Sequence, residues 1–407
     1  MSLYRTFDSA DLRIWLSTQI TLSTQLGGKP EEWSIKEVSD GNLNSVFLVH
    51  GLDSSLCCKQ ALPHVRVAPD WPMPLERALY EARYMRATEA AVTGLAPKLF
   101  HYDADLFLLV MECLSPHTVL RSALIADQVT PGFSETIGQY VAQTVHTTGW
   151  TTRPFEEGSR LLADFAGNTA LTRITVDLIL NDPYRVCTRN PEPEPALLSA
   201  VEALRTDRPL HAAISRLQNI FLTCRQALLH GDLHTGSIML HERDVRVIDG
   251  EFATMGPIGF DCGLYLGNLA LHACAAPQKM PAMEHEMRVF WAAFAEQFQT
   301  LVSQGGGDVG GLLEDDAARL TMVQDMLLGI LRDTAGFAGL EIIRRTIGFA
   351  QVADYSLCPD DAARTTARKR ALEIGRTLIM SAEAIESPDA LFALLCPSPA
   401  TGAPSLT

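Results

Sequence analysis

The chain has 407 residues, of which 47% are hydrophobic, which is enough apolar material for two or three globular units. Its formal net charge of −15 argues against nucleic acid or an anionic membrane surface as a partner. Nine cysteines without a Cys-x-x-Cys pair favour a reducing, cytoplasmic location, and neither a secretion signal nor a membrane-spanning run is evident.

The first 110 or so residues are predicted to be rich in strands. Apolar or alternating runs indicate strands at 35–38, 46–49, 56–59 and 106–111, with a hairpin tip between the first two. After Pro72 and Pro74, helical spacing predicts a helix over 75–85.

Beyond residue 115 the periodicity changes to that of long helices. The helical pattern covers 137–147, 196–227, 283–302, 317–331 and 362–385. We therefore predict a nucleotide-binding domain over 1–114 and a catalytic, substrate-binding helical domain over 115–407.

The segment 228–251, LLHGDLHTGSIMLHERDVRVIDGE, sets two acidic clusters on either side of a predicted β-hairpin. Asp232 follows His-Gly on a loop, where its carboxylate could orient a hydroxyl and accept its proton. Asp249 and Glu251 follow the next apolar run, and Gly250 between them is expected to bend the chain so that both reach one Mg²⁺. The alternative is two ordinary polar turns, but the spacing and order favour phosphoryl transfer.

A nucleotide site is predicted from the first domain. Gly41, at the hairpin tip, would let backbone N–H groups approach the phosphates of ATP, although a plain turn explains it equally well. Lys59, one strand further on, would contact the α and β phosphates. A buried lysine needs a counter-ion, for which Glu81 is the first choice and Glu76 the second. Otherwise Lys59 simply caps an edge strand.

Two further segments are candidates for the site. Main-chain groups of Glu112, Cys113 and Leu114, after the last strand of the first domain, are expected to bind adenine. Arg344 and Arg345 lie in an apolar neighbourhood, where two cations should find an anion, and guanidinium groups suit phosphoryl oxygens. A solvated helix face is the alternative for this pair.

Several of these motifs occur in an order that resembles the S-methyl-5-thioribose kinase family over nearly the whole chain: DGNLNSVF, CKQALPHVRV, LLHGDLHTGSI, DGEF followed by GPIGFDCG, and LEIIRRTIGFAQVAD. The resemblance implies an α+β, bilobal protein-kinase-like fold, with an antiparallel sheet and one helix in the small lobe and a large, mainly helical lobe. It implies a homodimer as well.

The same resemblance assigns roles to individual residues. Nucleotide and metal would be bound by Asn44, Lys59, Glu112 to Leu114, Asp249, Gly250 and Glu251, and the sugar and phosphoryl group by Asp232, Arg344 and Arg345. The chain departs from most kinase-like enzymes at Ser237, where an asparagine usually holds a second metal, so one Mg²⁺ is predicted. It departs from the family at Gly250, where alanine is expected, and at Cys113, where aspartate is expected.

The predicted reaction is transfer of the γ-phosphoryl group of ATP to the anomeric hydroxyl of methylthioribose, a step of methionine salvage. Two alternatives compete with it: a kinase of the same superfamily that acts on choline or an aminoglycoside, and a nucleotide-binding regulator without turnover. His230 and His234 are four residues apart, but they flank Asp232 on a loop without a third ligand cluster, which disfavours a zinc site.

Overall fold

The computed structural model describes residues 4–38, 43–66, 68–305, 307–309 and 315–397. The chain divides into two compact units. The first comprises Met1–His117 together with Ile248–Phe252, and the second comprises Thr118–Val247 together with Ala253–Thr407. The short return segment brings the Asp-Gly-Glu motif into the first unit.

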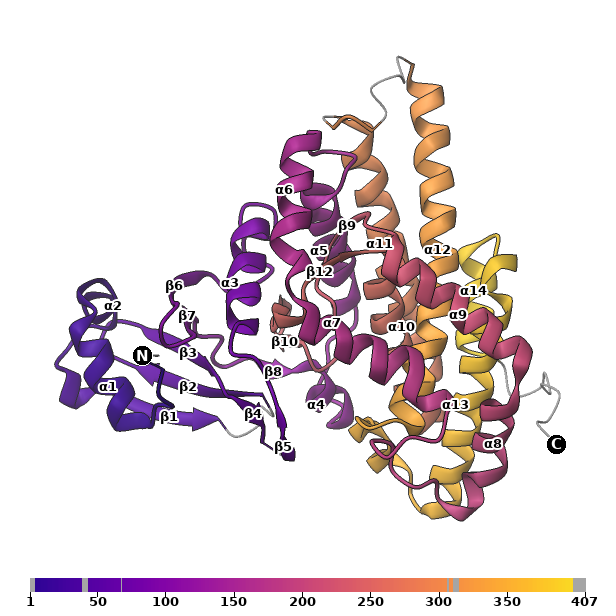
Figure 1. Ribbon diagram of the computed structural model, residues 1–407, viewed down its shortest axis with the longest axis horizontal. Coiled ribbons are helices and arrows are strands. Elements are labelled where there is room, and N and C mark those ends of the chain that lie inside the picture. Colours follow the sequence, from indigo (N-terminus) through magenta and orange to yellow (C-terminus); the bar gives the residue numbers. More distant parts are fainter. Residues whose placement is uncertain (1–3, 39–42, 67, 306, 310–314, 398–407) are drawn as a thin grey trace. The chain divides into compact units, whose positions relative to one another are not determined.

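The first unit contains a five-stranded antiparallel sheet (Figure 1). Its order is β1 (Ser34–Val38), β2 (Asn44–His50), β3 (Ser55–Ala61), β7 (Leu108–Glu112) and β6 (Leu99–Asp103). The four predicted strands are confirmed, although the last begins two residues late, because Phe107 has a positive φ of 49° and belongs to the preceding turn. A separate two-stranded ribbon joins β4 (His64–Val65) to β5 (Ala68–Pro72).

Helices cover both faces of this sheet. Alternate residues of β7 point to opposite faces, so Leu109 and Met111 pack with α3 (Arg77–Thr88), the predicted helix. Leu108 and Val110 pack with α1 (Ser9–Thr18) and α2 (Ile20–Leu26). Of these three helices, only α3 was predicted from the sequence, because α1 and α2 are short and each buries few apolar side chains.

The second unit is mainly helical, so the predicted α+β fold class is confirmed. Its α-helices are α4 (Leu120–Ile125), α5 (Phe133–Thr148), α6 (Phe155–Ala166), α7 (Thr169–Thr175), α8 (Leu198–Thr206), α9 (Arg208–Thr223), α10 (Gly259–Ala275), α11 (Met280–Ser303), α12 (Asp316–Ile347), α13 (Asp361–Ser381) and α14 (Pro388–Leu395). Its short strands are β8 (Thr118–Val119), β9 (Ala227–Leu229), β10 (Ile238–His241), β11 (Asp244–Val247) and β12 (Thr254–Gly256). Single turns of other helix types complete the described elements of both units: Pro30–Glu32, Val176–Asn181, Asp182–Tyr184, Pro195–Leu197, Gly250–Phe252, Pro277–Lys279, Ala353–Leu357 and Ala382–Ala384.

Two predictions for this unit need comment. The hairpin between the acidic clusters is confirmed as β10 and β11, which pair from Ile238 with Val247 to His241 with Asp244. The single helix predicted over 196–227 is wrong. The chain breaks at Asp207, whose side chain accepts a hydrogen bond from Leu210 N and caps α9. The second helix ends at Thr223, and Ala227 already belongs to strand β9.

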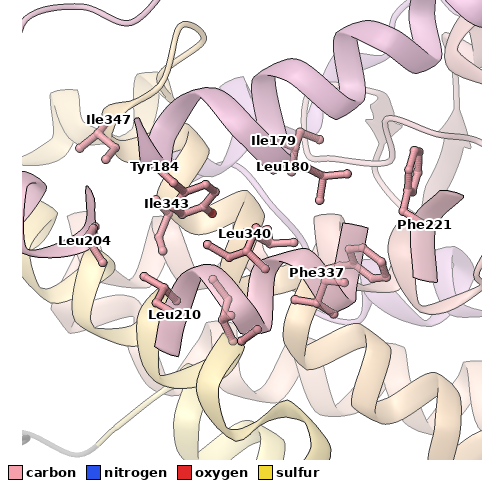
Figure 2. Close-up of a cluster of buried hydrophobic side chains, with 14 of the residues drawn as sticks. Ile179, Leu180, Tyr184, Leu204, Leu210, Phe221, Phe337, Leu340, Ile343 and Ile347 are labelled. Atoms are coloured by element: carbon pink, nitrogen blue, oxygen red, sulfur yellow. The ribbon is translucent and has the colours of Figure 1, made fainter. Parts of the chain in front are cut away.

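The core of the second unit fixes the position of α12. Phe337, Leu340 and Ile343 of α12 pack with Phe221 of α9 in one buried cluster (Figure 2). The twin arginines follow directly on the same helix, so the packing of this cluster determines where they lie.

Close contact between α10 and α12 depends on glycine. A Cβ atom at Gly263 would lie 2.7 Å from the backbone N of Ala338, and one at Gly259 would lie 2.7 Å from the backbone N of Thr334. Such distances are too short for carbon, so larger residues there would push the helices apart. No helix among the described residues has the length and apolar character needed to cross a membrane.

We predict opposite effects for the same substitution at two helical glycines. Gly263→Ala should lower the free energy of unfolding by about 1–3 kcal/mol, because the methyl group has no space against α12. Gly329→Ala should raise it by up to about 1 kcal/mol, because nothing lies within 4 Å of the added carbon and alanine favours helix. Denaturant titration measures both, and equal effects would contradict the proposed contact.

Candidate active site

Lys59 lies inside the sheet of the first unit. It pairs with Val46 on one side and Leu109 on the other, so the alternative that it caps an edge strand is wrong. Its Nζ lies 2.9 Å from Oε1 and 2.8 Å from Oε2 of Glu81, the first-choice counter-ion, and it also contacts Oδ1 of Asp249. Strand alternation explains the pairing, because Lys59 faces the same side of the sheet as Ala61, which packs with α3.

Asp249 and Glu251 lie on a tight turn of the first unit. The bend was expected at Gly250, but the left-handed residue is Asp249, with φ of 72°, and Gly250–Phe252 then forms a short 3₁₀ turn. Carboxylate oxygens of Glu81, Asp249 and Glu251 all lie within 4.8 Å of one another. The side chain of Asp249 is 44% exposed, whereas that of Glu251 is buried.

Packing, and not the bend of the chain, explains why residue 250 is glycine. A Cβ atom on this residue would lie 2.4 Å from Cδ1 of Tyr84 on α3. The turn therefore packs directly on the ring of Tyr84. This ring occupies the space that the methyl group of the alanine expected at position 250 would need.

Glu251 is held by two residues of the first unit. Nδ2 of Asn44 donates to Oε2 of Glu251 at 3.2 Å, and Nε of Arg77 lies 3.3 Å from the same oxygen. Arg77 is fully buried and also donates to the backbone oxygen of Leu43. Asn44 was predicted only through the family resemblance, and Arg77 was missed, because a single arginine in the first turn of α3 carries no sequence signal.

Charge in this cluster is unevenly balanced. Burial by itself lowers the pKa of Lys59, but Asp249, Glu81 and Glu251 outweigh it and raise that pKa, so the ammonium stays charged. Burial raises the pKa of Glu251, and the charge of Asp249 adds to this. Three carboxylates thus share two cations, Lys59 and Arg77, and a divalent cation would relieve the repulsion. Oxygen ligands of this kind suit Mg²⁺.

The loop that carries Asp232 is fixed in the second unit by its backbone. Asp261, in the first turn of α10, accepts hydrogen bonds from the N–H groups of His230 at 2.7 Å and Gly231 at 3.0 Å. Gly231 has a positive φ of 83°, and Oγ of Ser237 donates to the carbonyl of Asp232 at 2.8 Å. Asp261 was not predicted, because it lies 29 residues further along the chain.

His234 contacts the side chain of Asp232. Its Nε2 lies 3.3 Å from Oδ2 of Asp232, and its Nδ1 accepts a hydrogen bond from the N–H of Gly236 at 2.8 Å. Among the described residues, the group of His, Cys, Asp and Glu side chains placed closely enough to hold a metal is Glu81, Asp249 and Glu251.

Arg344 and Arg345 occupy the last turn of α12, and both are buried, so a solvated helix face is excluded. The expected anion is Glu341, one turn earlier. Its Oε2 accepts from Nη1 of Arg344 at 2.9 Å, and its Oε1 accepts from Nε of Arg345 at 2.7 Å. Glu341 lies three and four residues before the arginines, so all three side chains are neighbours on the surface of the helix. This spacing is visible in the sequence but was not used to predict the ion pairs.

Both guanidinium groups approach Asp232. Nη1 of Arg344 lies 3.9 Å and Nη2 of Arg345 lies 3.7 Å from its Oδ1. Burial alone would raise the pKa of Asp232, but His234 and the two arginines outweigh it and hold this pKa well below its usual range. Because burial lowers the pKa of His234 to about 4, the imidazole is neutral at pH 7 and the arginines supply the positive charge.

A second layer of polar side chains orients the first. Asn268 on α10 donates from Nδ2 to Oε1 of Glu341 at 3.0 Å and accepts at Oδ1 from Nη2 of Arg121 at 2.8 Å. Arg121 also donates from Nε to Oγ1 of Thr235 at 3.1 Å. These residues come from four separate segments of the chain, so spacing along the sequence offered no reason to connect them.

The chain is related to known phosphotransferases along most of its length. Residues 34–296 match the model of the phosphotransferase enzyme family. Methylthioribose kinase of Escherichia coli O45:K1 is 37% identical over 394 residues, which cover 93% of this chain and 94% of the relative. Methylthioribose kinase of Klebsiella pneumoniae is 38% identical over 409 residues, which cover 97% and 98%. The chain belongs to the methylthioribose kinase family.

Among solved structures, an ethanolamine kinase from Plasmodium vivax aligns with a TM-score of 0.48 and 12% identity over 93% of each chain. The family assignment rests on the methylthioribose kinases, whose identity extends over both units of this chain.

The predicted family residues gather in two clusters, one in each unit. In the first unit Asn44, Lys59, Asp249 and Glu251 are linked by direct contacts, together with Glu81, which was predicted separately as the counter-ion of Lys59. In the second unit Asp232 lies beside Arg344 and Arg345.

Four other residues were predicted for the nucleotide site: Glu112, Cys113, Leu114 and Gly41. Glu112 ends strand β7, and its N–H donates to the carbonyl of Lys98, so this donor is already engaged. Cys113 and Leu114 follow it and are partly buried, and burial raises the pKa of the Cys113 thiol. Gly41 lies outside the described residues.

We predict that Gly250→Ala lowers the free energy of unfolding by about 1–3 kcal/mol, because the new methyl group would overlap the ring of Tyr84. The cost should shrink in a Tyr84→Leu background, which a double-mutant cycle by denaturant titration would show. Additive effects of the two substitutions would mean that the turn does not depend on this contact.

Proposed function

We propose that this enzyme transfers the γ-phosphoryl group of ATP to the anomeric hydroxyl of S-methyl-5-thioribose, giving the 1-phosphate and ADP, as a step of methionine salvage. The observation that carries the proposal is the ionised Asp232 beside two buried arginines, in a chain that methylthioribose kinases match over 93–97% of its length. A cytoplasmic location, expected from the cysteine content, and a homodimer, implied by the family resemblance, belong to the same proposal.

We assign nucleotide binding to the first unit. Lys59 is kept charged by its carboxylate neighbours and is suited to the α and β phosphates. Asn44 and Gly250 fix the turn that carries Asp249 and Glu251, and those two carboxylates would hold Mg²⁺. When bound, Mg²⁺ would neutralise charge on the phosphates. Main-chain groups of Cys113 and Leu114, with the carbonyl of Glu112, would accept the adenine.

We assign the acceptor sugar to the second unit. Asp232 can accept a hydrogen bond from the anomeric hydroxyl and orient it toward the phosphorus. Its lowered pKa makes it a weak base, so it contributes chiefly by positioning and takes the proton late in the transfer. The described residues offer no acceptor within hydrogen-bond distance of Nε of Arg344 or Nη2 of Arg345. These donors suit phosphoryl oxygens, which need partners as charge develops.

A cationic acceptor such as choline or an aminoglycoside fits this unit poorly, because the buried arginines would repel it. A regulator without turnover is disfavoured by the presence of Lys59, Asp232, Asp249 and Glu251 in intact clusters. A protein without phosphotransfer would have no use for a partly buried, charged aspartate beside two buried arginines.

We predict that a coupled ADP-release assay with ATP and Mg²⁺ gives turnover with methylthioribose that exceeds turnover with choline or an aminoglycoside. Asp232→Asn should lower kcat by about 10²–10⁴-fold, because it removes the charge that orients the hydroxyl. Preference for a cationic acceptor would refute the proposed substrate. ATP binding without phosphorylation of any acceptor would favour the regulator.

Metal dependence gives a separate prediction. Asp249→Asn should raise the Mg²⁺ concentration for half-maximal activity by on the order of tenfold, because one charged oxygen ligand is lost. Folding should persist, since Glu81 still pairs with Lys59. The matched control is Asp105→Asn, an exposed aspartate of the same unit, which should leave the Mg²⁺ dependence unchanged. An unaltered Mg²⁺ dependence in Asp249→Asn would exclude this carboxylate as a ligand.

A further inference from the structure

We propose that His234 is a positioning residue whose Nε2–H group donates a hydrogen bond to Oδ2 of Asp232 and holds that carboxylate in its working orientation. The proposal rests on the proposed function, because it assigns His234 a part in the same reaction. In the sequence this histidine was considered only as a zinc ligand, which its position on the loop disfavours.

The neighbours of His234 determine which ring nitrogen carries the proton. Nδ1 faces the N–H of Gly236 at 2.8 Å and Nη2 of Arg121 at 3.4 Å. Both of these groups can only donate, so Nδ1 must accept. The proton of the neutral ring therefore lies on Nε2, which is 3.3 Å from Oδ2 of Asp232.

The surrounding charges keep the ring neutral. Burial lowers the pKa of His234 to about 4, and although Asp232 favours the charged form, Arg345 and Arg121 oppose it. At neutral pH His234 is thus a fixed donor and does not compete with Asp232 for the proton of the acceptor.

The packing of the ring leaves it little freedom. A Cβ atom at Gly236 would lie 2.5 Å from Cε1 of His234, so the ring lies directly on the loop backbone. With Oδ2 of Asp232 bonded to His234, the other oxygen, Oδ1, is the one that lies 3.7 Å from Arg345 and 3.9 Å from Arg344. We infer that Oδ1 receives the acceptor hydroxyl and that His234 prevents the carboxylate from rotating away from it.

Two substitutions separate positioning from loop structure. In His234→Gln, the amide Nε2 replaces the ring Nε2 and can still donate to Asp232. In His234→Asn, the amide Oδ1 replaces the ring Nδ1 and can still accept from Gly236, but the side chain is too short to reach Asp232. Each variant thus preserves one of the two hydrogen bonds.

We expect His234→Gln to keep kcat with methylthioribose within about fivefold of the native value and His234→Asn to lower it by about 10²-fold, with the KM for ATP unchanged in both. In an Asp232→Asn background, His234→Asn should have no further effect. Equal losses in the two variants, or better retention by His234→Asn, would overturn the proposal in favour of a loop role.

The native protein provides a second test that does not depend on how the variants fold. ¹⁵N NMR of histidine-labelled protein at pH 7 should show a neutral imidazole protonated on Nε2, assigned as the signal that changes in Asp232→Asn. Protonation on Nδ1 would refute the proposed contact. Absence of methylthioribose turnover in the native enzyme would instead refute the proposed function, and the NMR result would still decide the hydrogen bond.

Discussion

The contact of Glu341 with Arg344 and Arg345 is the constraint on which the second unit depends. Two guanidinium groups can be buried at the end of α12 only because a carboxylate one turn earlier binds both. These bonds leave Nη2 of Arg345 without an acceptor, and this nitrogen and Nη1 of Arg344 both approach Oδ1 of Asp232. A structural ion pair therefore also fixes the geometry of the candidate acceptor site, and removing Glu341 would disturb stability and chemistry together.

The first unit also buries charged groups, but there the carboxylates outnumber the cations. Lys59 and Arg77 are buried beside three carboxylates, so negative charge is in excess. Repulsion among the three carboxylates destabilises the protein when no nucleotide is bound. Cations that arrive with the ligand would remove this repulsion. The strained backbone at Asp249 and the contact of Gly250 with Tyr84 are consistent with a turn that is held in place for binding.

Much of the fold could be predicted because it depends on local periodicity. Strands β1, β2, β3 and β7, helix α3, the hairpin of β10 and β11 and most long helices followed from the spacing of apolar residues. The prediction failed where polar details override periodicity, as at Asp207, whose capping bond ends one helix and starts another. It also failed for α1 and α2, whose apolar residues become meaningful only against the sheet.

For the candidate site, the sequence by itself determined the chemical groups: a loop aspartate, a metal-type acidic pair, a buried lysine and twin arginines. Only the tertiary structure determined which side chains and backbone groups these residues contact. Arg77 meets Glu251 across 174 residues of chain, and Asp261 bonds the backbone at His230 from a separate helix. The physical reason is that motifs arise from spacing along the chain, whereas charge compensation depends on which distant side chains packing brings within hydrogen-bond distance.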